Sequence, residues 1–140
     1  MTRQLLNPPE VYDAEPFGMS QGVIDLPSGL VLLSGQVAWD LKSQVQGKTV
    51  AEQTKHALRN LTAVLASAGC TAANVLHVRV YLRGEVSDHL EACVPLLAAY
   101  FGPTRPALTG IGVASLASKD TLIELEVVAR VPSAPGPVRK

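Results

Sequence analysis

Apolar and polar side chains alternate along two stretches of the chain, and each stretch predicts a half-buried β-strand. From Ile123 to Val131 every second residue is apolar, and the residues between them include Glu124 and Glu126. Successive side chains of a strand point to opposite faces of the sheet, so one face is core and both carboxylates lie on the other. Residues 74–83 alternate in the same way. The side chains expected to face inward are Leu76, Val78, Val80 and Leu82. Those expected to face outward are Val75, His77, Arg79, Tyr81 and Arg83.

The first third of the chain predicts a short strand followed by a hairpin. Residues Arg3 to Asn7 form the first strand, which Pro8 and Pro9 end. Residues 21–26 and 29–34 are apolar runs joined by Pro27, Ser28 and Gly29, which is a typical turn sequence. Residues 30–33 are all apolar, so this strand needs cover on both faces. Two helices cannot cover both sides of the sheet, and we therefore expect an oligomer.

Two stretches have the spacing of amphipathic helices. The first opens at Thr49, which forms a capping box with Glu52, and ends at Gly69. Its apolar stripe comprises Thr54, Ala57, Leu58, Leu61, Val64, Leu65 and Ala68. The second runs to Gly102 with Ser87 as its expected cap and Pro95 inside it. Its stripe comprises Leu90, Val94, Leu97 and Phe101.

These elements predict an α+β fold, a mixed sheet with two helices on one face. Residues 104–131 form a strand, a loop and the last strand, and Leu108, Gly110 and Gly112 lie beside the two carboxylates if these strands are neighbours. At 140 residues the chain fits one domain, which we place at 1–131. The remaining nine residues, 132–140, include three prolines and are expected to be a loose tail.

The amino-acid composition limits the classes of molecule that the protein is expected to bind. Twelve basic and twelve acidic residues give no net charge, which argues against nucleic acid and an anionic membrane surface. Two cysteines are too few for a disulfide framework, and no cluster has metal-ligand spacing, so we expect neither a metal nor a cofactor. The N-terminal residues lack a secretory apolar segment, and no stretch is long and apolar enough to span a bilayer. We therefore expect a cytoplasmic protein that binds a small molecule.

Several ordered motifs resemble one family. PALTGIGVASL followed by IELEVVARV resembles the closing strands of the RidA/YjgF family, and the match extends back through VRVYL, the helix from Thr49, LLSGQV and SQGV. It covers about residues 18–131. The resemblance implies a chorismate-mutase-like fold in which three subunits close their sheets into a trimeric barrel, with ligand clefts between neighbours. It also implies the activity of the best-known members, which are enamine and imine deaminases.

The resemblance also implies site residues. In the deaminases a glutamate of the last strand orients the attacking water, and this position is Glu124. The SGQ segment that lines the cleft is Ser34, Gly35 and Gln36, and the expected substrate-binding set also includes Met19, Trp39, Leu108, Thr109 and Gly110. The position of the cleft tyrosine is Met19, and that of the carboxylate-binding arginine is Leu108. We expect Glu124 to lie in the cleft, on the same side as Leu108. The position of an asparagine on the second helix of the deaminases is Val94.

The loss of that arginine matters because a guanidinium binds a carboxylate bidentately. Arg105 lies three residues before Leu108, so an extended strand would point it to the opposite face about 10 Å away. Arg79 or Arg83 of a neighbouring subunit is another possible donor, although nothing in the sequence indicates it.

Three residues keep two interpretations each. Trp39, the single tryptophan, either packs at a subunit contact or pocket rim or forms a wall against which substrate stacks. His77 is either a sheet or interface residue or a general base. Glu124 is either a catalytic acid/base or a solvated glutamate, and Glu126 is expected to be paired with a cation across the sheet.

The leading hypothesis is a homotrimer whose cleft handles a small, fairly apolar molecule, with weak or no deaminase activity on ordinary 2-imino acids. One alternative is an enamine or imine deaminase with a different carboxylate anchor. Another is a non-catalytic small-molecule-binding protein. Family members have also been called endoribonucleases, but six aromatic residues and zero net charge offer RNA little.

Overall fold

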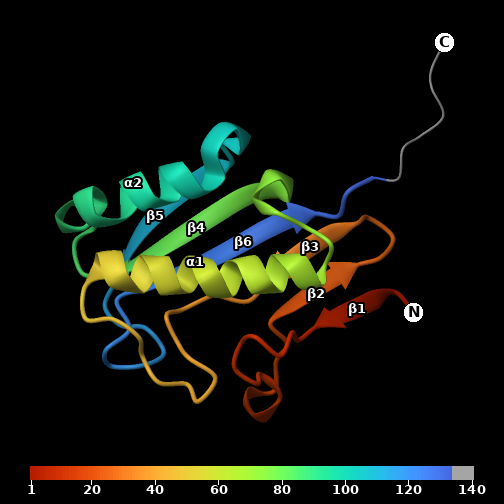
Figure 1. The fold of residues 1–140 in the computed structure, drawn as a ribbon, viewed down its shortest axis with the longest axis horizontal. Helices are drawn as coiled ribbons and strands as arrows, with labels where there is room; N and C mark the ends of the chain where they lie inside the picture. Colours follow the sequence, from red (N-terminus) through yellow and green to blue (C-terminus); the bar gives the residue numbers. More distant parts are fainter. Residues whose placement is uncertain (134–140) are drawn as a thin grey trace.

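The computed structural model describes residues 1–133 and has the predicted α+β architecture. The predicted tail at 132–140 lies outside the described residues, except for Pro132 and Ser133. Helices α1 and α2 lie together on one face of a mixed sheet (Figure 1). The elements are β1 (Arg3–Leu6), β2 (Gly22–Asp25), β3 (Leu30–Leu33), α1 (Val50–Ser67), β4 (Val75–Arg83), α2 (Leu90–Phe101), β5 (Ala107–Val113) and β6 (Ile123–Arg130).

The sheet has six strands in the order β1-β2-β3-β6-β4-β5, and only the β4–β5 pair is parallel. The last two strands of the chain are therefore not neighbours, because β4 lies between them. A parallel pair needs a crossover, and α2 with its flanking turns supplies it between β4 and β5. The condition under which Leu108, Gly110 and Gly112 would lie beside the two carboxylates, that β5 and β6 are neighbours, is therefore not met.

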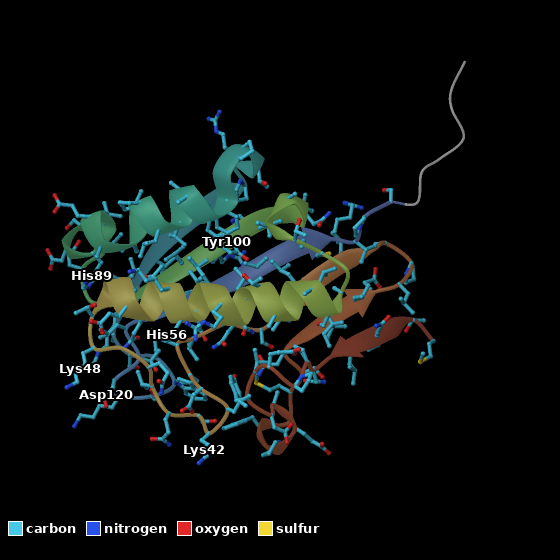
Figure 2. All side chains as sticks on the ribbon, viewed as in Figure 1. Lys42, Lys48, His56, His89, Tyr100 and Asp120 are labelled. Atoms are coloured by element: carbon cyan, nitrogen blue, oxygen red, sulfur yellow. The ribbon has the colours of Figure 1, made fainter. Side chains whose placement is uncertain are left out.

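The core lies between the helices and one face of the sheet. The predicted inward residues of β6 are almost fully buried, and so is the predicted stripe of α1 except Ala68, which follows the helix and is partly buried. On the other face of β3, Leu32 is half exposed. A single chain therefore covers only one of the two apolar faces of residues 30–33. The hydroxyl groups of Thr62 on α1 and Tyr100 on α2 are 2.7 Å apart and join the two helices (Figure 2).

Helix α1 begins as predicted, with one difference in its cap. The Thr49 side chain accepts a hydrogen bond from the Glu52 backbone N–H at 3.2 Å. The Glu52 carboxylate, however, accepts from the backbone N–H of Lys48 at 2.8 Å. The helix ends at Ser67, and Gly69 adopts a left-handed conformation just after it, which suits glycine.

Three details of the predicted pattern are wrong. A bulge between Val75 and His77 reverses the start of β4, so Val75 is buried and Leu76 is exposed. Ser87 lies in a short 3-10 turn and does not cap α2, whose N-cap is His89. In α2 the buried residues are Cys93, Leu97 and Phe101, whereas the predicted stripe residues Leu90 and Val94 are exposed.

Candidate functional site

Seven of the nine predicted site residues line two hollows on opposite faces of the sheet, and the other two, Gln36 and Thr109, line neither. The hollow that contains Glu124, here called the Glu124 hollow, has a volume of about 580 Å³. Five predicted residues line it: Met19, Ser34, Gly35, Trp39 and Glu124, together with Tyr12, Phe17, Tyr81, Ala117 and Glu126. It lies on the face of the sheet that the helices leave open.

Strand β6 and the segment after β3 hold Glu124 in place. Its neighbour Leu125 exchanges two backbone hydrogen bonds with Gln36, at 2.8 and 2.9 Å. This pairing brings Gly35 against the Glu124 side chain, where a Cβ atom at position 35 would overlap the carboxylate. Glycine at position 35 thus leaves room for the Glu124 side chain, which would have to move if a Cβ atom were added there.

Gln36 supports the hollow from behind, since it is 1% exposed and does not line it. Its side-chain nitrogen donates to the Gln21 side-chain oxygen and to the Ser34 carbonyl, both at 3.0 Å. Gln21 in turn donates to the Tyr12 carbonyl at 2.8 Å. This chain of amides fixes the N-terminal loop against the segment that carries Gly35.

Three aromatic rings form one wall of the Glu124 hollow. The ring centroids are 5.0 Å apart for Tyr12 and Trp39, 6.0 Å for Tyr12 and Phe17, and 6.4 Å for Phe17 and Trp39. The indole nitrogen of Trp39 donates to Thr121 at 3.2 Å. The sequence reasoning missed Tyr12 and Phe17 because they lie in a loop without periodicity, although with Trp39 they are half of the six aromatic residues.

Gln53 of α1 joins the two loops at the same end of the sheet. Its side-chain nitrogen donates to the carbonyls of Gly47 and Asp120, at 3.1 and 2.8 Å. Its side-chain oxygen accepts from the backbone N–H of Leu122 at 2.8 Å. The labelled Lys48 and Asp120 mark these adjoining loops in Figure 2. The loop that carries Trp39 is therefore anchored to the loop that leads into β6.

The two carboxylates of β6 have different surroundings. Glu126 accepts from the Arg79 guanidinium at 2.9 Å and from the Tyr81 hydroxyl at 3.0 Å, which confirms the predicted cross-strand pair. The Glu124 carboxylate has no hydrogen bond or ion pair with any of residues 1–133. Burial and then the negative charge of Glu126 raise the pKa of Glu124 above its ordinary value. An acid with a raised pKa is suited to proton transfer near neutral pH.

The second hollow, here called the Leu108 hollow, lies between α2 and strands β4 and β5. It has a volume of about 270 Å³ and is almost entirely apolar. Leu108 and Gly110 line it, together with Val80, Leu82, Leu90, Cys93, Val94, Leu97 and Phe101. Three of these side chains remain open to solvent: Leu90 is 44%, Val94 is 47% and Leu108 is 50% exposed.

Strand register explains why Leu108 and Glu124 are separated. Leu108 is paired with Val78, which faces the helices, whereas Glu124 is paired with Tyr81 on the open face. The expectation that both lie on one side of the sheet is therefore wrong within a single chain. Thr109 is paired with Arg79 and so lies on the open face, outside both hollows.

Arg105 also differs from expectation. It precedes β5 and adopts a left-handed conformation with φ of 46°, so the alternation of an extended strand does not apply to it. It lines the Leu108 hollow together with Leu108 itself. His77, by contrast, lies on the open face of the sheet but lines neither hollow.

No group of three or more His, Cys, Asp or Glu side chains within residues 1–133 could hold a metal ion. Neither helix of the described chain is long and apolar enough to cross a membrane.

Comparison with known proteins identifies the family. The family model described as endoribonuclease L-PSP matches residues 15–131. A RutC family protein of Pyrococcus horikoshii is 33% identical over 100 residues, covering 71% of this chain and 77% of the relative. Human 2-iminobutanoate/2-iminopropanoate deaminase is 35% identical over 100 residues, covering 71% of each chain.

A solved structure agrees. A Yersinia pestis protein of the conserved Rid protein family, of unknown function, superposes with a TM-score of 0.82 at 25% identity, covering 92% of this chain and 99% of that one. The match of the family model spans most of the chain and includes both hollows except Tyr12. The chain therefore belongs to the endoribonuclease L-PSP family, which is the RidA/YjgF family that its closing strands resemble.

Proposed function

We propose that this protein is a homotrimer in which the Glu124 hollow of one subunit faces the Leu108 hollow of the next. The cleft between them takes a small, fairly apolar molecule, and Glu124 is the acid/base for hydrolysis of a carbon–nitrogen double bond. Ordinary 2-imino acids are poor substrates of this cleft.

The observation that carries this proposal is the division of the site between two faces of one sheet. Glu124 and Leu108 cannot contact the same ligand within one chain, because their strands place them on opposite faces. A second chain brings such faces together when the interface is heterologous, as in a cyclic trimer. The exposed apolar side chains of the Leu108 hollow and the half-exposed Leu32 support an interface on both faces.

The chemistry follows from the Glu124 carboxylate. As a base it takes a proton from water while the hydroxyl oxygen adds to the carbon of the C=N bond. As an acid it gives this proton to the nitrogen, which yields a carbinolamine. It then takes the hydroxyl proton of the carbinolamine and passes it to the nitrogen, so that the C–N bond breaks, the carbonyl forms and ammonia or an amine leaves. The raised pKa of Glu124 makes its carboxyl group a better proton donor and acceptor for these steps than an ordinary glutamate.

Leu108 makes substrates with a carboxylate group poor, because it stands where the deaminases have a carboxylate-binding arginine. A charge-assisted hydrogen bond contributes about 1.5 to 3 kcal/mol, so loss of a bidentate pair weakens carboxylate binding by roughly 3 to 6 kcal/mol. Because about 1.4 kcal/mol corresponds to a factor of ten, carboxylate affinity falls by about a hundredfold or more. An isobutyl group also removes water from the carboxylate without replacing its hydrogen bonds.

One observation favours a second candidate function, a deaminase of ordinary 2-imino acids. Arg105 lines the Leu108 hollow and is a possible anchor for the carboxylate. Curated relatives carry the name 2-iminobutanoate/2-iminopropanoate deaminase. In this case Arg105→Ala would abolish hydrolysis of 2-iminobutanoate, whereas our proposal expects little hydrolysis to begin with.

Two measurements test the proposal. Light scattering at micromolar concentration is expected to give the mass of a trimer, and a monomer would overturn the proposed cleft. Hydrolysis of imines formed in situ is then compared between 2-iminobutanoate and an imine that lacks a carboxylate. We expect the imine without a carboxylate to be hydrolysed faster, and we expect this hydrolysis to be lost in Glu124→Gln. Efficient turnover of 2-iminobutanoate by the unmodified protein would favour the Arg105 alternative.

A further inference from the structure

The Glu124 hollow combines an aromatic wall with one uncompensated negative charge. Tyr12, Phe17 and Trp39 pack into a continuous wall, and Glu124 lines the same hollow. An aromatic ring has a negative face that attracts cations, and a carboxylate attracts them more strongly. Both features therefore favour the same kind of ligand.

The charges around Glu124 do not cancel its own. The nearby titratable groups are Glu126 on β6, Arg79 and Tyr81 on β4, and Tyr12 in the N-terminal loop. Arg79 is bound to Glu126, so this pair is neutral. Both tyrosines have raised pKa values, for Tyr12 chiefly by burial and for Tyr81 chiefly by its hydrogen bond to Glu126, and they remain uncharged at neutral pH. The hollow is left with one net negative charge.

Ring spacing determines where a cation would lie. At centroid distances of 5.0 to 6.4 Å the three rings contact each other, so no group fits between them. Tyr12 is almost fully buried, whereas Phe17 is 58% exposed. A ligand therefore contacts the open surfaces of Phe17 and Trp39 and reaches Glu124 beside them.

We propose that the Glu124 hollow binds a protonated nitrogen, an ammonium or iminium group, on a ligand that has an apolar body and no carboxylate. The nitrogen lies between the Glu124 carboxylate and the faces of Phe17 and Trp39. The apolar body points to the Leu108 hollow of the next subunit, and this part rests on the proposed function. The ligand class is thus a cationic amine, or the protonated imine formed from one, rather than an amino-acid derivative.

The proposal has a pH signature. A cation binds the ionised form of Glu124, whose pKa in the free protein is raised above its usual value near 4.5. Affinity for a cation should therefore fall as pH decreases through that raised pKa, and binding at this pH should release protons. A ligand that merely packs against apolar surface would show neither effect.

Trp39 provides the assay, because it is the single tryptophan and lines the hollow. The change in its fluorescence is measured with three probes of similar shape: benzylammonium, benzyl alcohol and benzoate. We expect benzylammonium to bind about tenfold to a hundredfold more tightly than benzyl alcohol, from the cation–π and ionic contributions together. Benzoate should bind most weakly.

Three variants make the test specific. Glu124→Gln should reduce the preference for benzylammonium by about tenfold, and Phe17→Leu by about threefold to fivefold. Phe17 is largely exposed, so its replacement should leave the fold intact. Glu91→Gln removes one negative charge from an exposed position of α2 outside both hollows and should leave the preference unchanged.

The outcomes separate this inference from the proposed function. If benzyl alcohol or benzoate binds as tightly as benzylammonium, the hollow does not select cations and the inference is overturned. An equal loss of preference in Glu91→Gln would overturn it too, because the effect would then arise from overall charge. If the preference holds but no imine is hydrolysed, the inference stands and the catalytic function fails.

Discussion

The two hollows differ in chemistry although they share strand β4. The Glu124 hollow is lined by aromatic rings and two carboxylates, whereas the Leu108 hollow is lined mostly by apolar side chains, with Arg105 as its one charged residue. Tyr81 of β4 faces the first, and its neighbours Val80 and Leu82 face the second. Alternation along one strand thus builds half of a polar site and half of an apolar site. Neither half is closed within one chain, which is why we assign the complete site to two subunits.

Gly35→Ala, which adds one carbon atom to the Glu124 hollow, is expected to have the largest effect on the rate of imine hydrolysis. Gly35→Ala would place a Cβ atom where the Glu124 carboxylate lies, so the carboxylate must move. Removal of a general acid/base typically costs about 10²- to 10⁴-fold in rate, and we expect Gly35→Ala to approach Glu124→Gln in imine hydrolysis. Gly110→Ala in the Leu108 hollow meets Val86 at an ordinary 3.6 Å. A loss as large in Gly110→Ala as in Gly35→Ala would contradict this account.

Leu108→Arg tests the apolar half. Restoring the guanidinium should raise hydrolysis of 2-iminobutanoate by about a hundredfold or more, because the carboxylate regains a bidentate partner. Thr109→Arg adds the same charge one residue further, on the opposite face of the sheet. It should produce no comparable gain. Equal gains in both variants would show that position 108 has no special access to the substrate.

Val94→Asp tests whether the Leu108 hollow is covered by another subunit. Val94 is 47% exposed in the single chain, so an aspartate there should leave the monomer folded. Burying an unpaired charge at an interface costs several kcal/mol, on the order of 3 to 5, and should dissociate the proposed trimer. Ala99→Asp, exposed on α2 outside the hollow, is the control. A trimeric Val94→Asp protein would place the interface elsewhere.

The smallest expected effect is a pH-dependent change in the free energy of unfolding of Glu124→Gln. Burial raises the pKa of Glu124, so the folded state binds its proton more tightly than the unfolded state does. The stability that this proton provides is present below the unfolded pKa and is lost as pH rises through the raised pKa. Glu124→Gln should therefore be more stable at neutral pH by about 0.5 to 2 kcal/mol, the range of single stabilising substitutions. The difference should vanish in acid.

Urea unfolding at several pH values measures this difference. Glu126→Gln is the matched comparison, because it breaks a half-exposed ion pair worth about 0 to 1 kcal/mol. It should be neutral or destabilising at neutral pH. A Glu124→Gln protein that is less stable than the unmodified protein at neutral pH would show that the carboxylate has a favourable partner.

Most of the fold followed from the sequence, because the elements that carry it are periodic. The alternation of β6 and the stripe of α1 are both confirmed by burial. Local irregularities were not predictable in the same way. The bulge at Val75 reverses two residues of β4, and the left-handed Arg105 escapes the alternation of β5. Neither departure is visible in the alternation of apolar and polar residues from which the strands were predicted.

The site was less predictable than the fold. The motif positions located Glu124, Ser34 and Gly35 in one hollow, but the sequence could not reveal that β4 separates β5 from β6. This order puts Leu108 on the other face. Tyr12 and Phe17 were missed because a loop has no period that assigns its side chains to a surface. Strand order and loop packing are set by long-range contacts that local patterns do not encode.

Complementation between subunits tests the central claim most directly. The double variant Leu108→Arg/Glu124→Gln lacks the acid/base, and the unmodified protein lacks the arginine, so neither should hydrolyse 2-iminobutanoate efficiently. Co-expressed in equal amounts, they should form mixed trimers in which about a quarter of the clefts combine the introduced arginine with an intact Glu124. We predict about a quarter of the activity of Leu108→Arg. If Leu108→Arg is active but the mixture is no more active than its two parents, the site does not lie between subunits and the account is wrong.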